Sequence, residues 1–345
     1  MQSAVPASPP SDSTIAALAE IVSAEMQAGR PEAAASIAKM ASAFAPGDPS
    51  AQRLLASVAD AAADRSEPPQ ERGANFHLAR ARAFRIIGER QQAEAEFHAA
   101  LASDPNCVEA HVGLSELRLP GEGYLVWLRR LHEVLRPRVY LEIGVEYGYT
   151  LSLAQPPTRA IGIDPQPQIA VPLASETQVF AERSDDFFAR DDLKSLLAEE
   201  ALSLAFIDGE HVFAQSLRDF MHVEALCDER SLVLLHDTIP LDEVTQRPER
   251  QRTFYTGDVW KTVLCLKHYR PDLDIFTIAT PWSGLTAVMG LDPGSSKLAH
   301  CYDQAVADFG RLRYADFENT LQHALNIVPN DWTIVEAGLR ARKLV

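Results

Sequence analysis

The spacing of hydrophobic residues divides the chain into two parts. From Ser13 onward, alanine-rich segments have apolar residues at helical spacing, broken by turn-forming clusters such as Gly29–Pro31, Pro46–Pro49 and Asp104–Pro105. These breaks predict about six amphipathic helices before residue 120. Beyond Pro120, short apolar runs alternate with helical segments, which indicates a different architecture.

Six apolar runs of strand length lie in the second part, at residues 139–143, 159–163, 178–181, 202–207, 232–235 and 275–279. Helical patterns separate them, and this alternation predicts parallel βαβ units in a doubly wound, Rossmann-like sheet. A further run, Thr286–Gly290, is expected to add an antiparallel strand. The sequence therefore predicts a disordered terminus over 1–11, an all-α helical-hairpin domain over 12–120, and an α/β domain with C-terminal helices over 121–345.

Two stretches of the first part share a spacing, in which a Gly is followed by Ala after 5 residues, by Ala after 12 and by Pro after 17. The first stretch contains Gly29, Ala34, Ala41 and Pro46, and the second contains Gly88, Ala93, Ala100 and Pro105. Such a Gly ends a helix, small alanines let two helices approach, and Pro stops the second helix. The pattern resembles the tetratricopeptide repeat, most clearly over residues 74–107. We expect this domain to be either a structural cap or a surface for a protein partner or a second copy of the chain.

Composition narrows the class of protein. The 345 residues are 46% hydrophobic and 23% charged, as in ordinary globular proteins. The net charge of −16 disfavours nucleic acid and anionic membranes as partners. The four cysteines form no CxxC pair, and no signal peptide or membrane span is recognisable. We expect a cytoplasmic location.

A glycine pair follows the first predicted strand. Glu142, Gly144 and Gly148 form a turn in which the glycines allow a close approach of backbone to ligand. The spacing is GxxxG, whereas dinucleotide pyrophosphates favour GxGxxG, so the expected ligand is a nucleoside without a pyrophosphate. Asp164 ends the second strand, where a carboxylate is placed to accept hydrogen bonds from ribose hydroxyls.

At these residues the chain resembles the class I S-adenosylmethionine-dependent methyltransferases, over roughly residues 122–292. The resemblance implies that Glu142 anchors the loop or the methionine amine, that Gly144 and Gly148 shape the cofactor pocket, and that Asp164 holds the ribose. It also implies that Ser184 or Asp185, after the third strand, faces the adenine. A solvated turn that caps a helix is the alternative for these two residues.

Carboxylates and imidazoles follow the next two strands. Asp208, Glu210 and His211 come directly after the run 202–207, and His236 and Asp237 end the run 232–235. Because the carboxyl ends of parallel strands share one edge of the sheet, these side chains are expected to converge. Unpaired charges there would be costly, so the pattern predicts either a bound cation or mutual hydrogen bonds.

The arrangement resembles metal-dependent O-methyltransferases of the catechol and sugar-modifying kinds. The resemblance implies that Asp208, His236 and Asp237 hold a divalent cation such as Mg²⁺ or Mn²⁺. His236 departs from the carboxylate usual there, and imidazole suits Mn²⁺, Fe or Zn²⁺ better than Mg²⁺. His211 stands where the catechol relatives have a basic lysine, which makes it the candidate general base, with Glu210 as the rival.

Residues 242–256 are expected to be a mobile lid over an acceptor pocket, and Tyr255, Trp260 and Trp282 are each candidates either for stacking on an acceptor or for the core. The function expected from the resemblance is O-methylation of a hydroxyl on a sugar, a glycan or another small polyol. The alternative is a helical-repeat adaptor or scaffold whose second domain is a catalytically degenerate nucleoside-binding domain.

Overall fold

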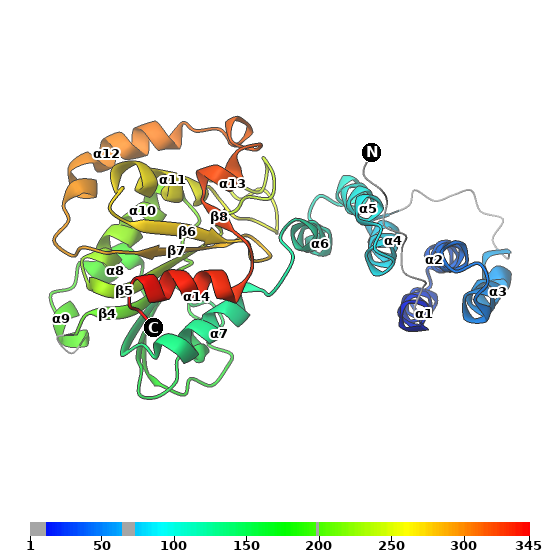
Figure 1. The fold of residues 1–345 in the computed structure, drawn as a ribbon, viewed down its shortest axis with the longest axis horizontal. Helices are drawn as coiled ribbons and strands as arrows, with labels where there is room; N and C mark the ends of the chain where they lie inside the picture. The colour runs from blue at the N-terminus through cyan, green and yellow to red at the C-terminus, as the bar shows by residue number, and fades with distance from the viewer. Residues whose placement is uncertain (1–11, 64–72, 198–199) are drawn as a thin grey trace. The chain divides into compact units, whose positions relative to one another are not determined.

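The computed structural model describes residues 12–63, 73–197 and 200–345, and the described residues form two compact units that divide between Leu117 and Arg118. The predicted disorder of 1–11 lies outside the described residues. The described helices up to Arg118 number six, in agreement with the breaks in the sequence pattern: α1 (Asp12–Gln27), α2 (Pro31–Phe44), α3 (Pro49–Ala63), α4 (Ala74–Ile86), α5 (Arg90–Ser103) and α6 (Val108–Arg118) (Figure 1).

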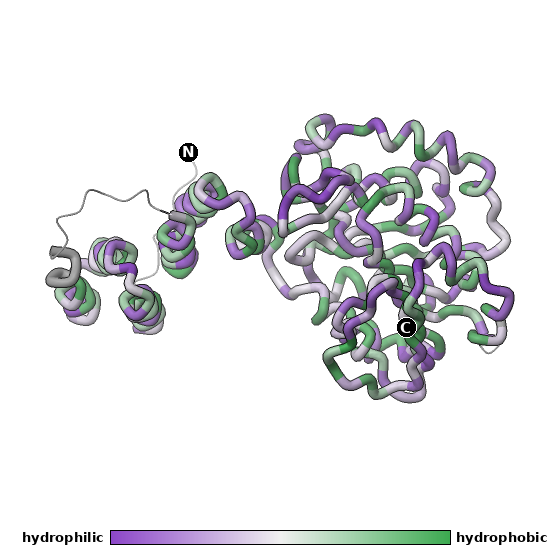
Figure 2. The backbone as a smooth tube through the Cα atoms, turned by 180° about the vertical axis from the view of Figure 1, so that it is seen from behind, coloured by the Kyte–Doolittle hydropathy of each residue, from purple (hydrophilic) through white to green (hydrophobic). Residues whose placement is uncertain are grey.

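Close helix packing in this first unit depends on small residues. Helix α1 packs on α2, α2 on α3, and α4 on α5. The alanines of the shared spacing, Ala34, Ala41, Ala93 and Ala100, are all 0% exposed. In Figure 2 the colour of these helices changes between hydrophobic and hydrophilic within single turns, as amphipathic helices require. The likeness to a tetratricopeptide repeat stays a prediction.

The second unit is built on one eight-stranded sheet with the order β3-β2-β1-β4-β5-β7-β6-β8. The strands are β1 (Val139–Ile143), β2 (Arg159–Ile163), β3 (Glu176–Phe180), β4 (Leu202–Ile207), β5 (Cys227–His236), β6 (Asp274–Ile278), β7 (Leu285–Met289) and β8 (Ile327–Val328). Strands β1 to β5 run parallel, while β7 pairs antiparallel with β5 and β6. The expected antiparallel strand is thus confirmed.

Helices cover both faces of the sheet (Figure 1). They are α7 (Tyr124–Leu135), the 3-10 turn η1 (Leu151–Leu153), α8 (Ser184–Phe188), α9 (Leu193–Leu196), α10 (Phe213–Glu224), α11 (Trp260–Tyr269), α12 (Lys297–Gly310), the 3-10 turn η2 (Tyr314–Asp316), α13 (Leu321–Ala324) and α14 (Trp332–Ala341). Helices α10, α11 and α12 share one apolar core, while α7 and α14 share the other.

Strand β1 shows how the sequence produces this layering. Its residues are all buried, and alternate side chains enter opposite cores: Leu141 and Ile143 join one, and Tyr140 joins the other. Because β1, β2, β4 and β5 run parallel, their carboxyl ends lie along one edge of the sheet, where the candidate residues are found. Within the described residues, no helix combines the length and hydrophobicity that a membrane crossing requires.

Candidate active site

The turn after β1 approaches the end of β4 without room for side chains. Gly144 has a φ of 89°, and a Cβ atom there would lie 1.9 Å from the carbonyl oxygen of Asp208. Gly148 has a φ of 79°, also in the left-handed region that favours glycine. Gly144 thus lets the turn approach the end of the strand that precedes Asp208, so the glycine turn and the acidic residues lie at one edge of the sheet.

Glu142 is 0% exposed and lies beneath the glycine turn, where it accepts hydrogen bonds from side chains on both sides of it. Its two carboxyl oxygens accept hydrogen bonds of 2.6 Å from the hydroxyls of Tyr140 and Thr150. Burial raises the pKa of Glu142 to about 8, although both hydroxyl donors oppose the shift. The bond to Thr150 ties the far side of the glycine turn to β1, which corresponds to the loop-anchoring alternative.

Asp164 ends β2 with its carboxylate turned toward the glycine turn. One oxygen accepts the Glu146 amide at 2.8 Å, and the other accepts the Gln166 amide at 2.7 Å. Each carboxylate oxygen has a second lone pair, so the group can still accept hydrogen bonds from two hydroxyls. These amides fix the orientation of Asp164 for the predicted contact with a ribose.

Ser184 and Asp185 are tied to helix α10. The Ser184 hydroxyl donates to the Asp219 carboxylate at 2.6 Å. Asp185 forms an ion pair with Arg218 at 3.1 Å and accepts from Gln215. Burial raises the pKa of Asp219 to about 6. Both residues begin α8, whose N-cap residue Arg183 makes no side-chain capping bond, so these contacts join α8 to α10 and do not cap the helix. The adenine contact stays a prediction.

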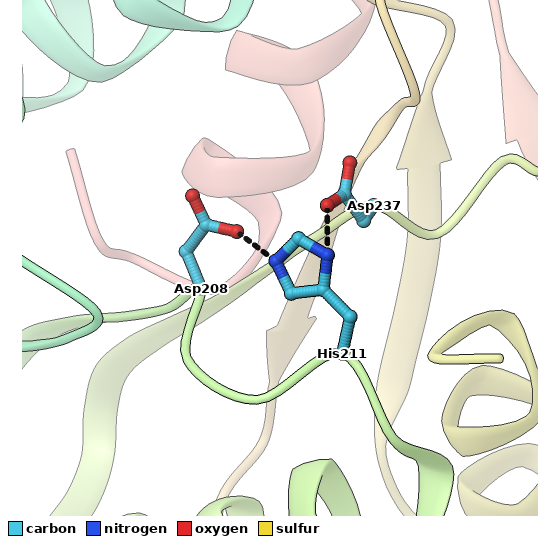
Figure 3. Close-up of side chains that lie close together, drawn as sticks. All are labelled: Asp208, His211 and Asp237. Atoms are coloured by element: carbon cyan, nitrogen blue, oxygen red, sulfur yellow. Dashed lines mark ion pairs between the residues drawn. The ribbon is translucent and has the colours of Figure 1, made fainter. Parts of the chain in front are cut away.

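Two carboxylates enclose one imidazole at the ends of β4 and β5. Figure 3 shows the His211 ring between Asp208 and Asp237. Its Nε2 lies 3.4 Å from an oxygen of Asp208, and its Nδ1 lies 3.0 Å from an oxygen of Asp237. The contact with Asp237 is an ion pair without the alignment of a hydrogen bond. The predicted convergence of residues from the two strands is present.

His236 contacts the same two carboxylates from the floor of the site. Its Nδ1 lies 3.1 Å from Asp208 and 3.5 Å from Asp237. Its Nε2 is buried without a hydrogen-bond partner among the described residues. The ring packs against Tyr124, at 4.2 Å between centroids. The Ser283 hydroxyl donates to Oδ1 of Asp237, the oxygen that lies near His236, whereas His211 contacts Oδ2.

These contacts shift the protonation of the cluster. Burial opposes the charged forms, yet Asp237 and Asp208 raise the pKa of His211 well above its usual value. Asp208 likewise raises the pKa of His236 against burial. In return, His236 and His211 lower the pKa of Asp208. The site therefore stabilises positive charge between two carboxylates.

Glu210, the rival base, lies in a different position. It forms a 2.9 Å ion pair with Arg183, and both side chains are at least half exposed. His211 contacts the carboxylates of Asp208 and Asp237, whereas the Glu210 carboxylate pairs with Arg183. Of the two candidates, His211 therefore belongs to the acidic cluster, and the identity of the base stays a prediction.

The cluster suits a divalent cation. Ligand atoms of Asp208, His211 and Asp237 lie within 4.8 Å of one another. The predicted set contained His236 in place of His211, and His236 also directs a nitrogen at both carboxylates. Two carboxylates with imidazole nitrogen form a donor set for Mn²⁺, Fe or Zn²⁺ more than for Mg²⁺. The residues fit a metal, and two histidines compete for the role of ligand.

The three aromatic candidates fall in different environments. Trp260 is 0% exposed and donates to Gln246, so it belongs to the core. Tyr255 stacks on the His211 ring, at 5.6 Å between centroids and 10° between planes. Trp282 is 46% exposed and precedes Ser283, the residue bonded to Asp237. Two of the three therefore lie close to the acidic cluster.

Sequence reasoning missed Tyr124, Ser283 and Asp219 as parts of the site. Tyr124 begins α7 and comes to His236 only through the packing of α7 on the sheet. Ser283 comes from the connection between β6 and β7. Asp219 lies in the middle of an amphipathic helix, where a polar residue on the buried face was the one available signal.

Comparisons agree with the class of site. Residues 141–238 match the family model of a methyltransferase domain. This stretch runs from within β1 past the end of β5, and so contains the candidate residues from Glu142 to Asp237. No curated protein matches the chain.

Several solved structures are similar to the chain. Cofactor-bound Rv0187 from MTB is 18% identical, with 58% of this chain and 97% of that chain covered and a TM-score of 0.39. The O-methyltransferase TomG from Streptomyces achromogenes, in complex with SAM, is 17% identical, with 59% and 90% covered and a TM-score of 0.38. The O-methyltransferase from Bacillus cereus, in complex with SAH, is 14% identical, with 68% and 97% covered and a TM-score of 0.37.

Proposed function

We propose that this chain transfers the methyl group of S-adenosylmethionine to a hydroxyl oxygen of a small acceptor. The observation that carries the proposal is the close contact of two halves of one site. The glycine turn that would hold the nucleoside touches the strand end that carries Asp208, and both lie in the matched methyltransferase domain. A methyl donor bound at the turn would have its acceptor beside the acidic cluster.

The residues at the turn divide the work of binding the cofactor. Asp164 accepts the ribose hydroxyls, Gly144 and Gly148 let the backbone approach the ligand, and Glu142 keeps the turn in shape. Ser184 or Asp185 faces the adenine. The sulfonium of S-adenosylmethionine supplies an already electrophilic methyl group. The protein therefore has to orient the acceptor oxygen in line with that group and remove its proton.

His211 is the proposed general base. The ring has to be neutral to act as a base, and a cation held by the carboxylates would offset the negative charge that keeps His211 protonated. The neutral imidazole would then accept the proton of the acceptor hydroxyl, while its oxygen bonds to the methyl carbon and the carbon–sulfur bond breaks to release S-adenosylhomocysteine. Asp208 and Asp237 hold the ring from both sides and stabilise the imidazolium produced. Glu210 remains the second candidate, because its exposed position would suit a larger acceptor.

We propose that a divalent cation assists this reaction. Asp208, His236 and Asp237 would hold it and leave His211 for the proton, while Asp208, His211 and Asp237 form the competing set. A bound cation supplies Lewis-acid polarisation of the acceptor oxygen. The two sets differ in one histidine each, which makes them separable by mutation.

The acceptor proposed is a sugar, a glycan or another small polyol. The carboxylates and imidazoles at the carboxyl ends of β4 and β5 suit molecules rich in hydroxyls, because they can form hydrogen bonds with those hydroxyls. The exposed Trp282 beside Ser283 offers an aromatic surface for the apolar face of a sugar ring. The described helices up to Leu117 are proposed to bind a protein partner or a second copy of the chain.

Labelled methyl transfer tests the proposal. Purified protein is incubated with methyl-labelled S-adenosylmethionine and a panel of monosaccharides, polyols and catechol, with EDTA or Mn²⁺. We expect labelled product from a hydroxyl acceptor, its loss with EDTA, and its recovery with Mn²⁺. His236→Gln should weaken Mn²⁺ binding, while His211→Gln should leave Mn²⁺ binding intact and abolish transfer.

Two outcomes separate the alternatives. Binding of S-adenosylhomocysteine without transfer to any acceptor would favour the adaptor with a degenerate nucleoside-binding domain. Transfer that persists in EDTA would remove the cation from the proposal and leave the imidazole cluster to act alone.

A further inference from the structure

The face of the His211 ring is covered by a residue from another part of the chain. Tyr255 lies in the connection between β5 and α11 and stacks almost parallel to the imidazole, with 10° between the planes. The Tyr255 hydroxyl donates to the Pro248 carbonyl at 2.5 Å. Arg250 lies over the Tyr255 ring, 5.8 Å from its centroid. Tyr255 is thus held at its hydroxyl and packed at its ring.

The backbone of the same segment holds the backbone of His211. The Asp258 amide donates to the His211 carbonyl at 3.2 Å. Gly257 has a φ of 60°, and a Cβ atom there would lie 1.7 Å from that carbonyl oxygen. The close approach is possible only because residue 257 has no side chain.

Asp258 continues the attachment into helix α10. One of its carboxylate oxygens accepts the Phe213 amide at 2.7 Å, which caps the first turn of the helix after His211. The other forms a buried 3.0 Å ion pair with Lys261. The segment is fixed at its other end, because the amides of Thr256 and Gly257 donate to the Thr245 carbonyl. Asp258, just after the expected lid of residues 242–256, is therefore bonded to the loop that carries His211, and Tyr255 within that lid stacks on the His211 ring.

We propose that Tyr255 is a positioning residue that fixes the orientation of the His211 imidazole, while Asp258 fixes the backbone that carries it. The two ion pairs of His211 lie at its two nitrogens. Rotation of the ring out of this orientation would break both pairs and the stacking contact. The parallel stacking of the two rings is itself attractive. The consequence for catalysis rests on the proposed function, whereas the orientation of the ring does not.

Ring resonances of ¹⁵N-histidine-labelled protein test the orientation without any substrate. The chain has 10 histidines, and His211→Gln identifies the signals of His211. We expect Tyr255→Leu to move the His211 signals toward those of exposed histidines, with a smaller change at His236, which contacts the same carboxylates, and none at the other eight histidines. Tyr255→Phe, which keeps the ring, should retain the wild-type His211 signals. Tyr269→Leu is the matched control, because Tyr269 packs against His268 on α11.

Activity provides the second measurement. Tyr255→Leu should lower kcat about 10- to 100-fold through misplacement of the base, with S-adenosylhomocysteine affinity unchanged, and Tyr255→Phe should restore kcat. Unchanged His211 signals in Tyr255→Leu would overturn the proposal, whatever the activity. If Tyr255→Leu does not fold, Tyr255→Phe decides: altered His211 signals would show that the Pro248 bond, and not the ring, fixes His211. Altered signals with unchanged kcat would instead count against His211 as the base.

Discussion

Replacement of Gly144 by alanine tests the contact that joins the two halves of the site. The residue has a φ of 89°, and a new Cβ atom would meet the Asp208 carbonyl oxygen at 1.9 Å. Contacts below 3.0 Å are essentially never seen for real Cβ atoms, so the turn or the end of β4 has to move by roughly 1 Å. Gly144→Ala is therefore expected to damage both folding and cofactor binding.

The magnitude follows from two costs. The left-handed backbone costs an alanine about 1–2 kcal/mol, and forced overpacking costs about 1–3 kcal/mol more. The free energy of unfolding should fall by about 2–5 kcal/mol. Gly290→Ala is the matched control, since Gly290 has a φ of 75° but meets only the movable guanidinium of Arg342, at 3.3 Å. That variant should lose about 1–2 kcal/mol, from the backbone alone.

Urea unfolding followed by tryptophan fluorescence measures the loss of stability in the second unit, which contains Gly144. All four tryptophans lie beyond residue 118, at positions 127, 260, 282 and 332. Calorimetric titration with S-adenosylhomocysteine should show at least tenfold weaker binding for Gly144→Ala and no change for Gly290→Ala. Equal stability losses in the two variants, with binding retained in Gly144→Ala, would refute the close approach of the turn to Asp208.

Three further predictions follow from named contacts. Asp164→Asn should weaken S-adenosylhomocysteine binding about 10- to 100-fold in calorimetry, because hydrogen bonds to a charged group are worth about 1.5–3 kcal/mol each, and unchanged affinity would contradict the ribose contact. Burial raises the pKa of Glu142 from 4.5 to about 8, so the folded state retains a proton that the unfolded state loses. The contribution of Glu142 to stability should be fully present below about pH 4.5 and decrease by up to about 1.4 kcal/mol per pH unit as pH rises toward 8. Urea unfolding at several pH values should show a smaller slope in Glu142→Gln, and an identical slope would count against this proton. Gly113→Ala places a Cβ atom 2.2 Å from the Phe97 ring. Scanning calorimetry should therefore show that the unfolding temperature of the first unit falls by about 5 °C or more, while the tryptophan fluorescence transition of the second unit stays unchanged. An unfolding temperature equal to that of the wild type would mean that α5 and α6 do not pack this closely.

The parts of this structure that follow local rules could be predicted from the sequence. The strands before Asp164, Asp208 and Asp237 are short apolar runs, and parallel strands bring their carboxyl ends to one edge. The convergence of the acidic residues follows from those two facts. Strand β5 begins earlier than its apolar run suggested, because its first residues include exposed Asp228, Glu229 and Arg230.

The contacts made between distant segments could not be predicted in this way. Nothing in the local pattern shows that Tyr255 covers His211, since 44 residues separate them and the pairing depends on the path of the connection after β5. Strand β8 has only two residues, Ile327 and Val328, too few for a period to be recognised. The choice between His211 and Glu210 likewise required the orientation of two adjacent side chains.

Calorimetric titration of the wild-type protein with S-adenosylhomocysteine tests the central claim most directly, because it requires neither the acceptor nor the metal. The account predicts saturable binding of one ligand per chain, lost when Asp164 and Gly144 are altered. An absence of binding at millimolar ligand, in protein whose tryptophan fluorescence shows that it is folded, would contradict the proposed methyltransferase function.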